Sequence, residues 1–237
     1  MRIDQQPAYI LHHRPFRETS LILDFFSRDH GRIHAVARGV RKAKSRWRGV
    51  LQPFSQIVIS AQGRGELLTL TLAEITGVPY ALSGDALAGG FYFNELMVRF
   101  LEREDAHPVL FDAYDAAMKT LSDSGMQERT LRLFEKTLLM ELGYGLALTQ
   151  VENPHTPIER DAWYEFYPDQ GLIRCEGPES PGNVFAGSSL QSFAEDSLLD
   201  PQSLQDAKRL MRLALASLPG AKPFQSRRLL VREVKKV

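Results

Sequence analysis

The first 80 residues alternate between apolar and polar positions in five short segments. These segments cover residues 8–14, 20–26, 32–38, 56–60 and 67–72. In the third segment, Ile33, Ala35 and Ala37 share one face, and a period of two residues is typical of a β-strand with one buried side. Turn residues follow at 29–31 and 63–65. Five strands in so short a stretch predict a small closed or partly open barrel of the oligonucleotide-binding (OB) type, with an SH3-like barrel as the structural alternative.

The pattern changes to a helical one after residue 80. Apolar residues recur every three or four positions in three segments, 92–101, 110–121 and 131–142. This spacing predicts three helices whose aromatic stripes form the core of a bundle. A further stripe over 204–218, preceded by Asp200 and Pro201, predicts a last helix.

Residues 146–187 contain many prolines and glycines and favour loops. Within them, apolar residues at 163–167 and 172–175 flank a turn at 168–171, which predicts a β-hairpin. The predicted fold class is therefore a multidomain α+β protein, with an N-terminal five-stranded OB-fold barrel followed by an α-helical domain. The predicted domains are an OB-fold domain at 1–80 and a helical domain at 81–237, with a loop or β-hairpin insertion at about 146–187.

Charge is distributed unevenly along the chain, although the formal net charge is zero. Residues 1–80 hold 12 Lys or Arg against 6 Asp or Glu, and residues 205–237 hold 9 against 2. Residues 81–204 hold 8 against 21. Basic ends around an acidic middle favour a polyanion-binding surface built from the ends. The alternative is that the acids screen the basic ends in the folded chain.

The densest charge lies at residues 39–49, between two predicted strands. Five cations and one indole occur there, and no acid interrupts them: Arg41, Lys42, Lys44, Arg46, Trp47 and Arg48. A folded core does not hold five unpaired cations, so this loop must face water or a polyanion. It is either a solvated turn or a loop that grips phosphates and carries one stacking ring.

Composition favours an ordinary globular protein, with 43% hydrophobic and 24% charged residues. No apolar run reaches about 18 residues, so no transmembrane helix is expected. The N-terminal MRIDQQP contains no apolar stretch of the kind found in a secretory signal, so none is expected. A single cysteine, Cys175, excludes an internal disulfide and any cysteine-rich zinc site. We therefore expect a cytoplasmic protein.

Motifs of common enzymes are absent from the sequence. It contains no P-loop, dinucleotide fingerprint, His-Glu-x-x-His or Gly-x-Ser-x-Gly. His30 and His34, with Asp24 or Asp29, could be imagined as a metal set, but their predicted places on a turn and an exposed strand face do not favour one. The middle carboxylates are spread over predicted helix surfaces. The chain is thus predicted to be no enzyme and to need no catalytic residue, metal or cofactor.

Binding of nucleic acid fits the charge pattern better. Small barrels bind single strands through cations that follow the phosphates and rings that stack on bases. The predicted DNA-binding residues are Arg14, Arg17, Arg38, Arg41, Lys42, Lys44, Arg46, Trp47, Arg48, Arg227 and Arg228. Trp47 could instead pack against the end of the barrel. No base-reading pattern is present, so we expect binding that does not depend on sequence.

Several segments, in order along almost the whole chain, resemble the RecO family of recombination mediators. The N-terminal ones are 14–23 (RPFRETSLIL), 31–39 (GRIHAVARG) and 51–54 (LQPF). The later ones are 93–96 (FNEL), 132–135 (RLFE), 142–144 (LGY) and 222–227 (KPFQSR). Each motif alone is weak, but the ordered set is specific.

The resemblance implies an OB-fold barrel, a helical domain and a small insertion. It also implies binding of single- and double-stranded DNA, annealing of complementary strands, and loading of RecA with RecR as partner, in the cytoplasm at the nucleoid. Some members carry a four-cysteine zinc site after the third helix. Only Cys175 is present here, so no structural zinc is expected and packing must hold the 163–175 hairpin.

The family further implies docking of the acidic C-terminal tail of the single-stranded-DNA-binding protein on the helical domain. A tail of acids and aromatics needs a groove with a cation at its mouth, and Arg129, Arg132 and Lys136 are the candidates. Arg132 and Lys136 are four residues apart and share a helix face. The alternative is that they balance Glu128 and Glu135.

Two other functions stay open on the sequence. The chain could be a protein-interaction adaptor in which the acidic middle is the binding surface and contact with DNA is incidental. It could also be a metal-dependent nuclease, although no compact acidic cluster with a supporting Lys or His is present.

Overall fold

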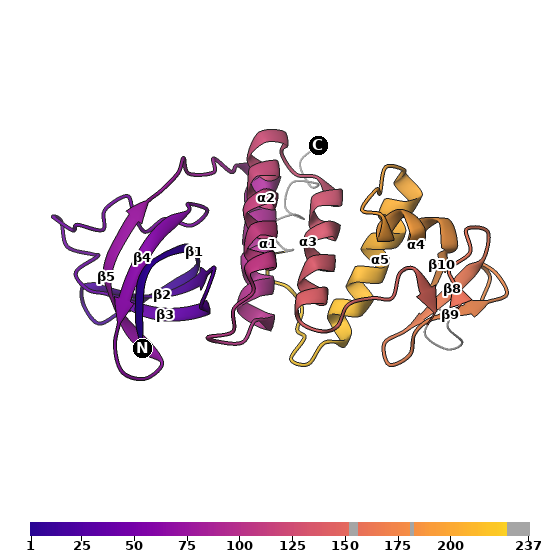
Figure 1. The fold of residues 1–237 in the computed structure, drawn as a ribbon. Helices are drawn as coiled ribbons and strands as arrows, with labels where there is room; N and C mark the ends of the chain where they lie inside the picture. Colours follow the sequence, from indigo (N-terminus) through magenta and orange to yellow (C-terminus); the bar gives the residue numbers. More distant parts are fainter. Residues whose placement is uncertain (152–155, 181–182, 227–237) are drawn as a thin grey trace. The chain divides into compact units, whose positions relative to one another are not determined.

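The computed structural model describes residues 1–151, 156–180 and 183–226 (Figure 1). By its contacts the chain divides into two compact units. The first contains Met1–Met126 together with the described residues from Phe224 onward, and the second contains Gln127–Pro223. The chain therefore leaves the first unit at residue 126 and returns to it near its C-terminal end.

The first unit begins with a closed five-stranded barrel. Its strands are β1 (Arg2–Phe16), β2 (Ser20–Ser27), β3 (Gly31–Ala37), β4 (Ile57–Gln62) and β5 (Leu67–Ile75). They follow the order β1-β2-β3-β5-β4, and β1 also pairs with β4 to close the barrel. The pairing of β3 with β5 is parallel, as in a Greek-key OB barrel. The predicted α+β fold class with an N-terminal OB barrel is confirmed.

Alternation along the strands fills the interior of the barrel. Ile33, Ala35 and Ala37 on β3 are buried, as their shared face predicts, and they meet Leu23 and Phe25 of β2 in one apolar core. Since each of these side chains is at most 2% exposed, the barrel has a filled interior rather than a channel. Any ligand must therefore bind on its outer surface or at its ends.

Two helices of the first unit, α1 (Gly84–Phe100) and α2 (Pro108–Ser124), pack against β1. The buried Asn94 amide donates to the Leu11 carbonyl at 3.0 Å, and its oxygen accepts from the Tyr114 hydroxyl at 2.7 Å. The Asp115 carboxylate accepts hydrogen bonds from Tyr9 and from Tyr80. Burial, followed by the hydrogen bond to Asp115, raises the pKa of Tyr80 to about 12. These bonds join helices and barrel into one body.

Arg32, near the start of β3, joins the barrel to the C-terminal end of α1. Its Nη1 donates to the Val98 carbonyl at 2.6 Å, and its Nη2 donates to Asp24 at 2.7 Å. The neighbouring Gly31 has φ +62°, and a Cβ there would lie 1.7 Å from the Asp105 carbonyl oxygen. Only glycine allows this close approach.

The second unit combines three helices with small sheets. Its helices are α3 (Glu128–Glu141), α4 (Gly187–Ala194) and α5 (Pro201–Ser217). Its strands are β6 (Gln150–Val151), β7 (Thr156–Pro157), β8 (Trp163–Tyr167), β9 (Gly171–Cys175) and β10 (Val184–Ala186). The predicted hairpin is confirmed by β8 and β9, which pair from Trp163↔Cys175 to Tyr167↔Gly171. The helix α4 and the strand β10 were not predicted.

Arg209 of α5 ties that helix to the small sheet. Its guanidinium donates to the Val184 carbonyl at 3.1 Å and lies 4.9 Å from the centre of the Phe185 ring. Strand β10 pairs with β8 of the hairpin, from Val184↔Glu165 to Ala186↔Trp163, so α5 contacts the sheet to which the hairpin belongs. Within the described residues, no helix is long and apolar enough to cross a membrane.

The start of α5 depends on the ionised Asp200 carboxylate, which accepts from the Ser203 backbone N–H at 2.8 Å. Hydrogen bonds from Ser203 hold the pKa of Asp200 below its usual value. The stabilisation is therefore present above the unfolded pKa, about 4, and is lost as the pH falls through the lower folded pKa. Asp200→Asn keeps a cap that does not titrate.

We therefore expect the free energy of unfolding of D200N to fall less than that of the parent chain between about pH 5 and pH 3. Urea denaturation across this range measures the difference. Parallel pH profiles for the two proteins would contradict this role of Asp200.

Candidate nucleic-acid interface

Strand register brings the predicted N-terminal cations to one end of the barrel. Phe16 pairs with Ser20 and Leu21 pairs with Ala37, so the end of β1, the start of β2 and the end of β3 lie together. Arg14, Arg17 and Arg38 extend from these positions, and all are exposed. The Arg41 N–H donates to the Thr19 carbonyl at 3.0 Å, which ties the basic loop to the β1–β2 turn.

The basic loop is a chain of hydrogen-bonded turns. The Ser45 N–H donates to the Lys42 carbonyl at 3.1 Å, and the Arg48 N–H donates to the Ser45 carbonyl at 3.2 Å. Gly39 and Gly49 bound the loop with φ of +73° and +80°, a backbone region that glycine enters without strain. The cations are consequently displayed from an ordered backbone.

Trp47 packs into the barrel, which is the arrangement that the sequence left open as the alternative to stacking. Only 4% of the residue is exposed, and its Nε1 donates to the Arg38 carbonyl at 3.0 Å. The Arg46 guanidinium lies 4.1 Å from the centre of the indole ring. A base could stack on this ring only if these contacts were broken. The indole therefore anchors the loop to the core.

The cations at this end of the barrel have no carboxylate partner among the residues that the structure describes. They are Arg14, Arg17, Arg38, Arg41, Lys42, Lys44, Arg46 and Arg48, and all eight are exposed. Arg46 alone donates to a backbone carbonyl, that of Thr71, at 3.3 Å. Elsewhere in the unit, Arg28 pairs with Asp112 and Arg32 with Asp24. The eight cations of the predicted site are thus not compensated by any carboxylate that the structure describes.

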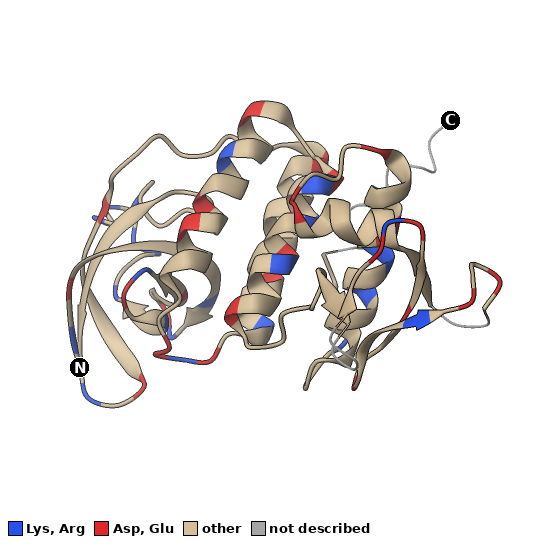
Figure 2. Cartoon of the chain, turned by 45° about the vertical axis from the view of Figure 1, so that its right-hand side comes forward, with Lys and Arg blue, Asp and Glu red and all other residues tan. Residues whose placement is uncertain are grey.

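Figure 2 shows the two charge types along the chain, with acids in red along the helices as well as cations in blue. Two acids of α1 and α2 pair with cations of the same unit, Glu95 with Arg99 at 2.7 Å and Asp112 with Arg28 at 2.9 Å. These two acids therefore neutralise cations other than those of the basic loop.

A cavity of about 500 Å³ lies between the β1–β2 strands and the basic loop. Polar and cationic groups from His13, Lys42, Ser45 and Arg48 line it. Leu21, Val40, Trp47 and Leu51 provide apolar walls. Cations beside an apolar surface suit the phosphate and base of a nucleotide. This cavity was not visible in the sequence, because its walls come from segments about 30 residues apart.

The C-terminal cations Arg227 and Arg228 lie outside the described residues. Their place relative to the barrel end therefore stays a prediction.

The α3 cations are already bonded within the second unit. Lys136 donates to the Phe193 and Ala194 carbonyls at 2.8 and 2.9 Å, at the C-terminal end of α4. Arg129 donates to the Ser197 carbonyl at 2.8 Å. Arg132 is 4% exposed and pairs with Glu135 at 2.9 Å. Of the two cations expected on one open face, only Lys136 reaches the surface, because Arg132 turns into the protein.

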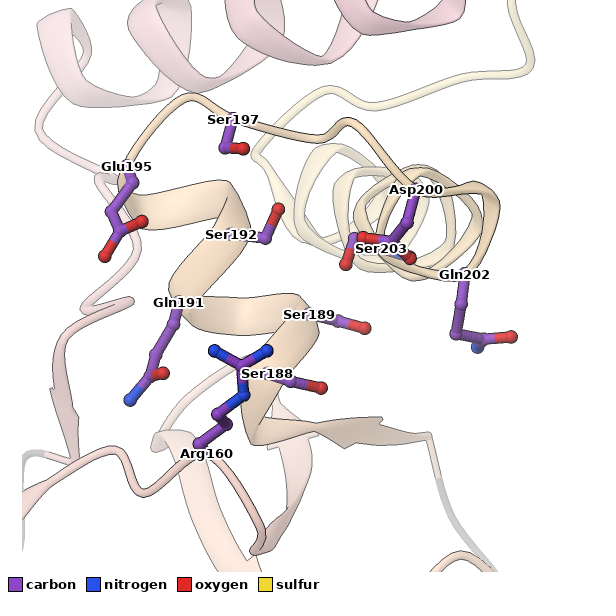
Figure 3. A pocket seen from close by; sticks show the side chains of 10 residues that line it. All are labelled: Arg160, Ser188, Ser189, Gln191, Ser192, Glu195, Ser197, Asp200, Gln202 and Ser203. Carbon is purple, nitrogen blue, oxygen red and sulfur yellow. The ribbon is translucent and has the colours of Figure 1, made fainter.

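Described residues of α3 and α4 contribute to two cavities in the second unit. The larger, about 430 Å³, lies beside α4 and the start of α5, and Figure 3 shows polar side chains around it, including Arg160, Gln191 and Asp200. None of the ten residues drawn there is aromatic or aliphatic. The smaller cavity, about 180 Å³, lies at the C-terminal end of α3, and apolar groups of Leu139, Tyr144 and Phe166 form part of its walls. Only the smaller one suits an aromatic ligand group.

Among the described residues, no group of three or more His, Cys, Asp or Glu side chains is placed to bind a metal ion. His30 and His34 with Asp24 or Asp29 therefore do not form such a group. The His34 Nε2 lies 3.1 Å from Asp24. The same carboxylate accepts three hydrogen bonds from Arg32. Asp24 therefore serves as an ion-pair partner at this position.

Comparison of the chain with known proteins matches it to one family. The model "Recombination protein O N terminal" matches residues 1–79, and "Recombination protein O C terminal" matches residues 81–228. A protein named DNA repair protein RecO from Coxiella burnetii (strain CbuG_Q212) is 45% identical over 229 residues, which cover 97% of this chain and 98% of that protein. Proteins of the same name from Nitrosococcus oceani and Alkalilimnicola ehrlichii are 42% and 46% identical, covering 97% and 96% of this chain and 94% and 91% of theirs.

The packing role of Trp47 makes a clear prediction for Trp47→Phe. This change removes the N–H that donates to Arg38 but keeps an aromatic ring in the core. We expect the free energy of unfolding to fall by about 1 kcal/mol and the affinity for single-stranded DNA to stay nearly unchanged. Urea denaturation and fluorescence anisotropy with a labelled oligonucleotide measure the two quantities. A loss of affinity at unchanged stability would restore the stacking interpretation.

Proposed function

Since this chain belongs to the RecO family of DNA repair proteins, we propose that it is a non-enzymatic recombination mediator. It binds single- and double-stranded DNA at the basic end of the barrel and anneals complementary strands. With RecR, it helps to load RecA on DNA that the single-stranded-DNA-binding protein covers.

The observation that carries the proposal is the group of eight exposed cations that have no carboxylate partner in the part of the chain that the structure describes. Like charges held this close repel one another, and phosphates relieve that repulsion while the DNA releases its condensed counterions. An ordered loop backbone adds affinity for a polyanion, because less of the loop has to be ordered on binding. The cavity beside Lys42 and Arg48 provides room for one nucleotide within this charged surface.

Annealing follows from the same charges without a catalytic residue. Two DNA strands repel each other, and a basic surface that holds both lowers the cost of bringing them together. No covalent bond forms or breaks in this process. Contacts to phosphate without base reading would make pairing independent of sequence.

The unpaired cations of the loop are expected to carry most of the DNA contact. If about six cations contact single-stranded DNA, the logarithm of affinity falls with the logarithm of salt at a slope of about −4. Changing Arg41, Lys42, Lys44, Arg46 and Arg48 together to Ala should reduce the slope by about 3 and abolish annealing. Anisotropy titrations at several salt concentrations and a strand-annealing assay measure both effects.

The matched control changes Arg2, Arg28 and Arg103 to Ala, since each of these cations already pairs with a carboxylate. We expect the control to keep its slope and its annealing. A fourfold variant that retains Arg46 and its bond to Thr71 tests whether any loss comes from unfolding. Unchanged annealing in the fivefold variant would remove the loop from the mechanism, and binding that ignores salt would favour the protein-interaction adaptor.

We extend the proposal to the acidic tail of the single-stranded-DNA-binding protein, which we expect on the second unit near α3. The apolar cavity with Leu139, Tyr144 and Phe166 follows this helix, and Tyr144 is 51% exposed. Arg129 and Lys136 are exposed or half-buried on the same helix and could add bonds to a carboxylate, whereas Arg132 would have to leave Glu135.

Arg129→Ala should weaken binding of a synthetic peptide of acids ending in phenylalanine by about two- to fivefold, the range of an exposed ion pair. Fluorescence anisotropy of the labelled peptide measures this affinity. Arg212→Ala, at an exposed cation of α5, serves as the charge-matched control. Equal losses in both variants would indicate general attraction rather than a docking site on α3.

A further inference from the structure

The cavity beside the basic loop is lined by one ring from the inner face of the barrel, that of His13. His13 of β1 pairs with Leu23 of β2, and residues directly opposite each other in an antiparallel pair point to the same face of the sheet. Leu23 is fully buried in the barrel core, so His13 occupies an inward-facing position. His13 is nevertheless exposed and lines the cavity. The core therefore stops short of His13, and the barrel is open at this point.

Apolar side chains continue the barrel core up to the cavity. Leu21 lies two residues from Leu23 and so on the same face of β2. Leu21 and Val40 are half-buried against the core, and both line the cavity. The ring of Trp47 also lines it, but that residue is only 4% exposed. Among the described residues that line the cavity, His13 is thus the one exposed ring, and it lies beside an aliphatic wall.

The polar groups at the cavity suit a nucleotide. Lys42 and Arg48 are exposed there, and no Asp or Glu is among the described residues that line it. The exposed Gln52 amide both donates and accepts hydrogen bonds, so it can bond to the edge of any base. The volume of about 500 Å³ falls within the range of sites for small organic ligands. A nucleotide whose phosphate binds the two cations can place its base against the His13 ring.

From this arrangement we infer that the cavity takes one unpaired base of a DNA strand, which stacks on the His13 imidazole. The inference rests on the proposed DNA-binding function and adds to it a means of distinguishing single strands from duplexes. Aromatic rings, including that of histidine, stack on the bases of single strands. A base in a duplex is already stacked and paired, and extruding it is costly. A duplex is therefore held through its phosphates, with the cavity unfilled.

This base site favours release of the annealed product. Before pairing, a single strand is held by its phosphates and by one base in the cavity. Once a complementary strand pairs with it, that base leaves the cavity and only the phosphate contacts remain. His13 takes part in no covalent step, so it is a specificity-determining residue that contacts the base.

Removing the bases from the ligand isolates this contact. The probes are two labelled oligomers of equal length, one of thymidylate and one built of abasic units, which carry the same number of phosphates. We expect His13→Ala to weaken binding of the thymidylate oligomer by about five- to tenfold, the effect of one stacked base. Binding of the abasic oligomer and of a blunt duplex should stay unchanged, which also shows that the barrel end is folded. Fluorescence anisotropy measures all three affinities.

Other substitutions separate the ring from its charge. His13→Phe keeps a ring without a charge and should retain the preference for thymidylate over abasic units. His13→Lys keeps a cation without a ring and should lose that preference. His12→Ala is the matched control, because the His12 and His13 ring centres are 6.5 Å apart but His12 pairs with Asp24, whose side chain lies on the other face of the sheet. His12→Ala should leave all three affinities unchanged.

The ratio of the two oligomer affinities decides the matter. If His13→Ala keeps the parent's ratio, or if His12→Ala lowers it equally, the cavity does not hold the base at His13. If His13→Lys keeps the ratio, the ring is not the contact. In each of these cases salt-dependent binding of the abasic oligomer would leave the proposed function standing. If the parent chain binds neither oligomer in a salt-dependent way, the proposed function itself fails.

Discussion

Closure of the barrel is the constraint on which the arrangement of charge depends. Because β1 pairs with β2 along its second half and with β4 along its first, the sheet has no free edge and its interior is filled by Leu23, Phe25 and Ile33. Ligands are thereby restricted to the outside, and the loops at the barrel ends are the places where side chains can change without disturbing the core. The basic loop occupies one of these ends, and Arg32 with the end of α1 occupies the other.

The cations of the first unit include some that pair with a carboxylate and others that have no such partner among the described residues. Arg28, Arg32 and Arg103 lie within ion-pair distance of carboxylates, so they mainly position helices and turns. The cations around the β1–β2 turn and in the basic loop have no carboxylate partner among the described residues. The indole of Trp47 holds the backbone of the basic loop in place. Ion pairs therefore involve Arg28, Arg32 and Arg103, and the cations at the barrel end are left as a basic surface for a polyanion.

The sequence predicted the elements better than the contacts between them. Periods of two and of about 3.6 residues identified the five strands, the long helices and the 163–175 hairpin, because these patterns follow from burial of one face. The eight-residue α4 is too short and too rich in serine to give such a pattern.

Charge density located the basic loop, but it could not decide whether Trp47 points outward, since a single ring in a loop has no periodicity. Likewise, the spacing of four residues predicted that Arg132 and Lys136 share one face of a helix. It gave no information on the carbonyls at the end of α4, to which Lys136 donates. The hydrogen bonds from the Gln225 and Ser226 N–H groups to the Glu95 carboxylate join residues about 130 positions apart, and local patterns carry no information at that distance.

The most direct test of the central claim is hydrogen–deuterium exchange of the whole chain with and without a single-stranded oligonucleotide, at low salt. The account predicts slowed exchange of backbone amides in the β1–β2 turn and in residues 38–49 when the oligonucleotide binds. Slowed exchange confined to Gln127–Pro223, with the barrel end unchanged, would contradict it.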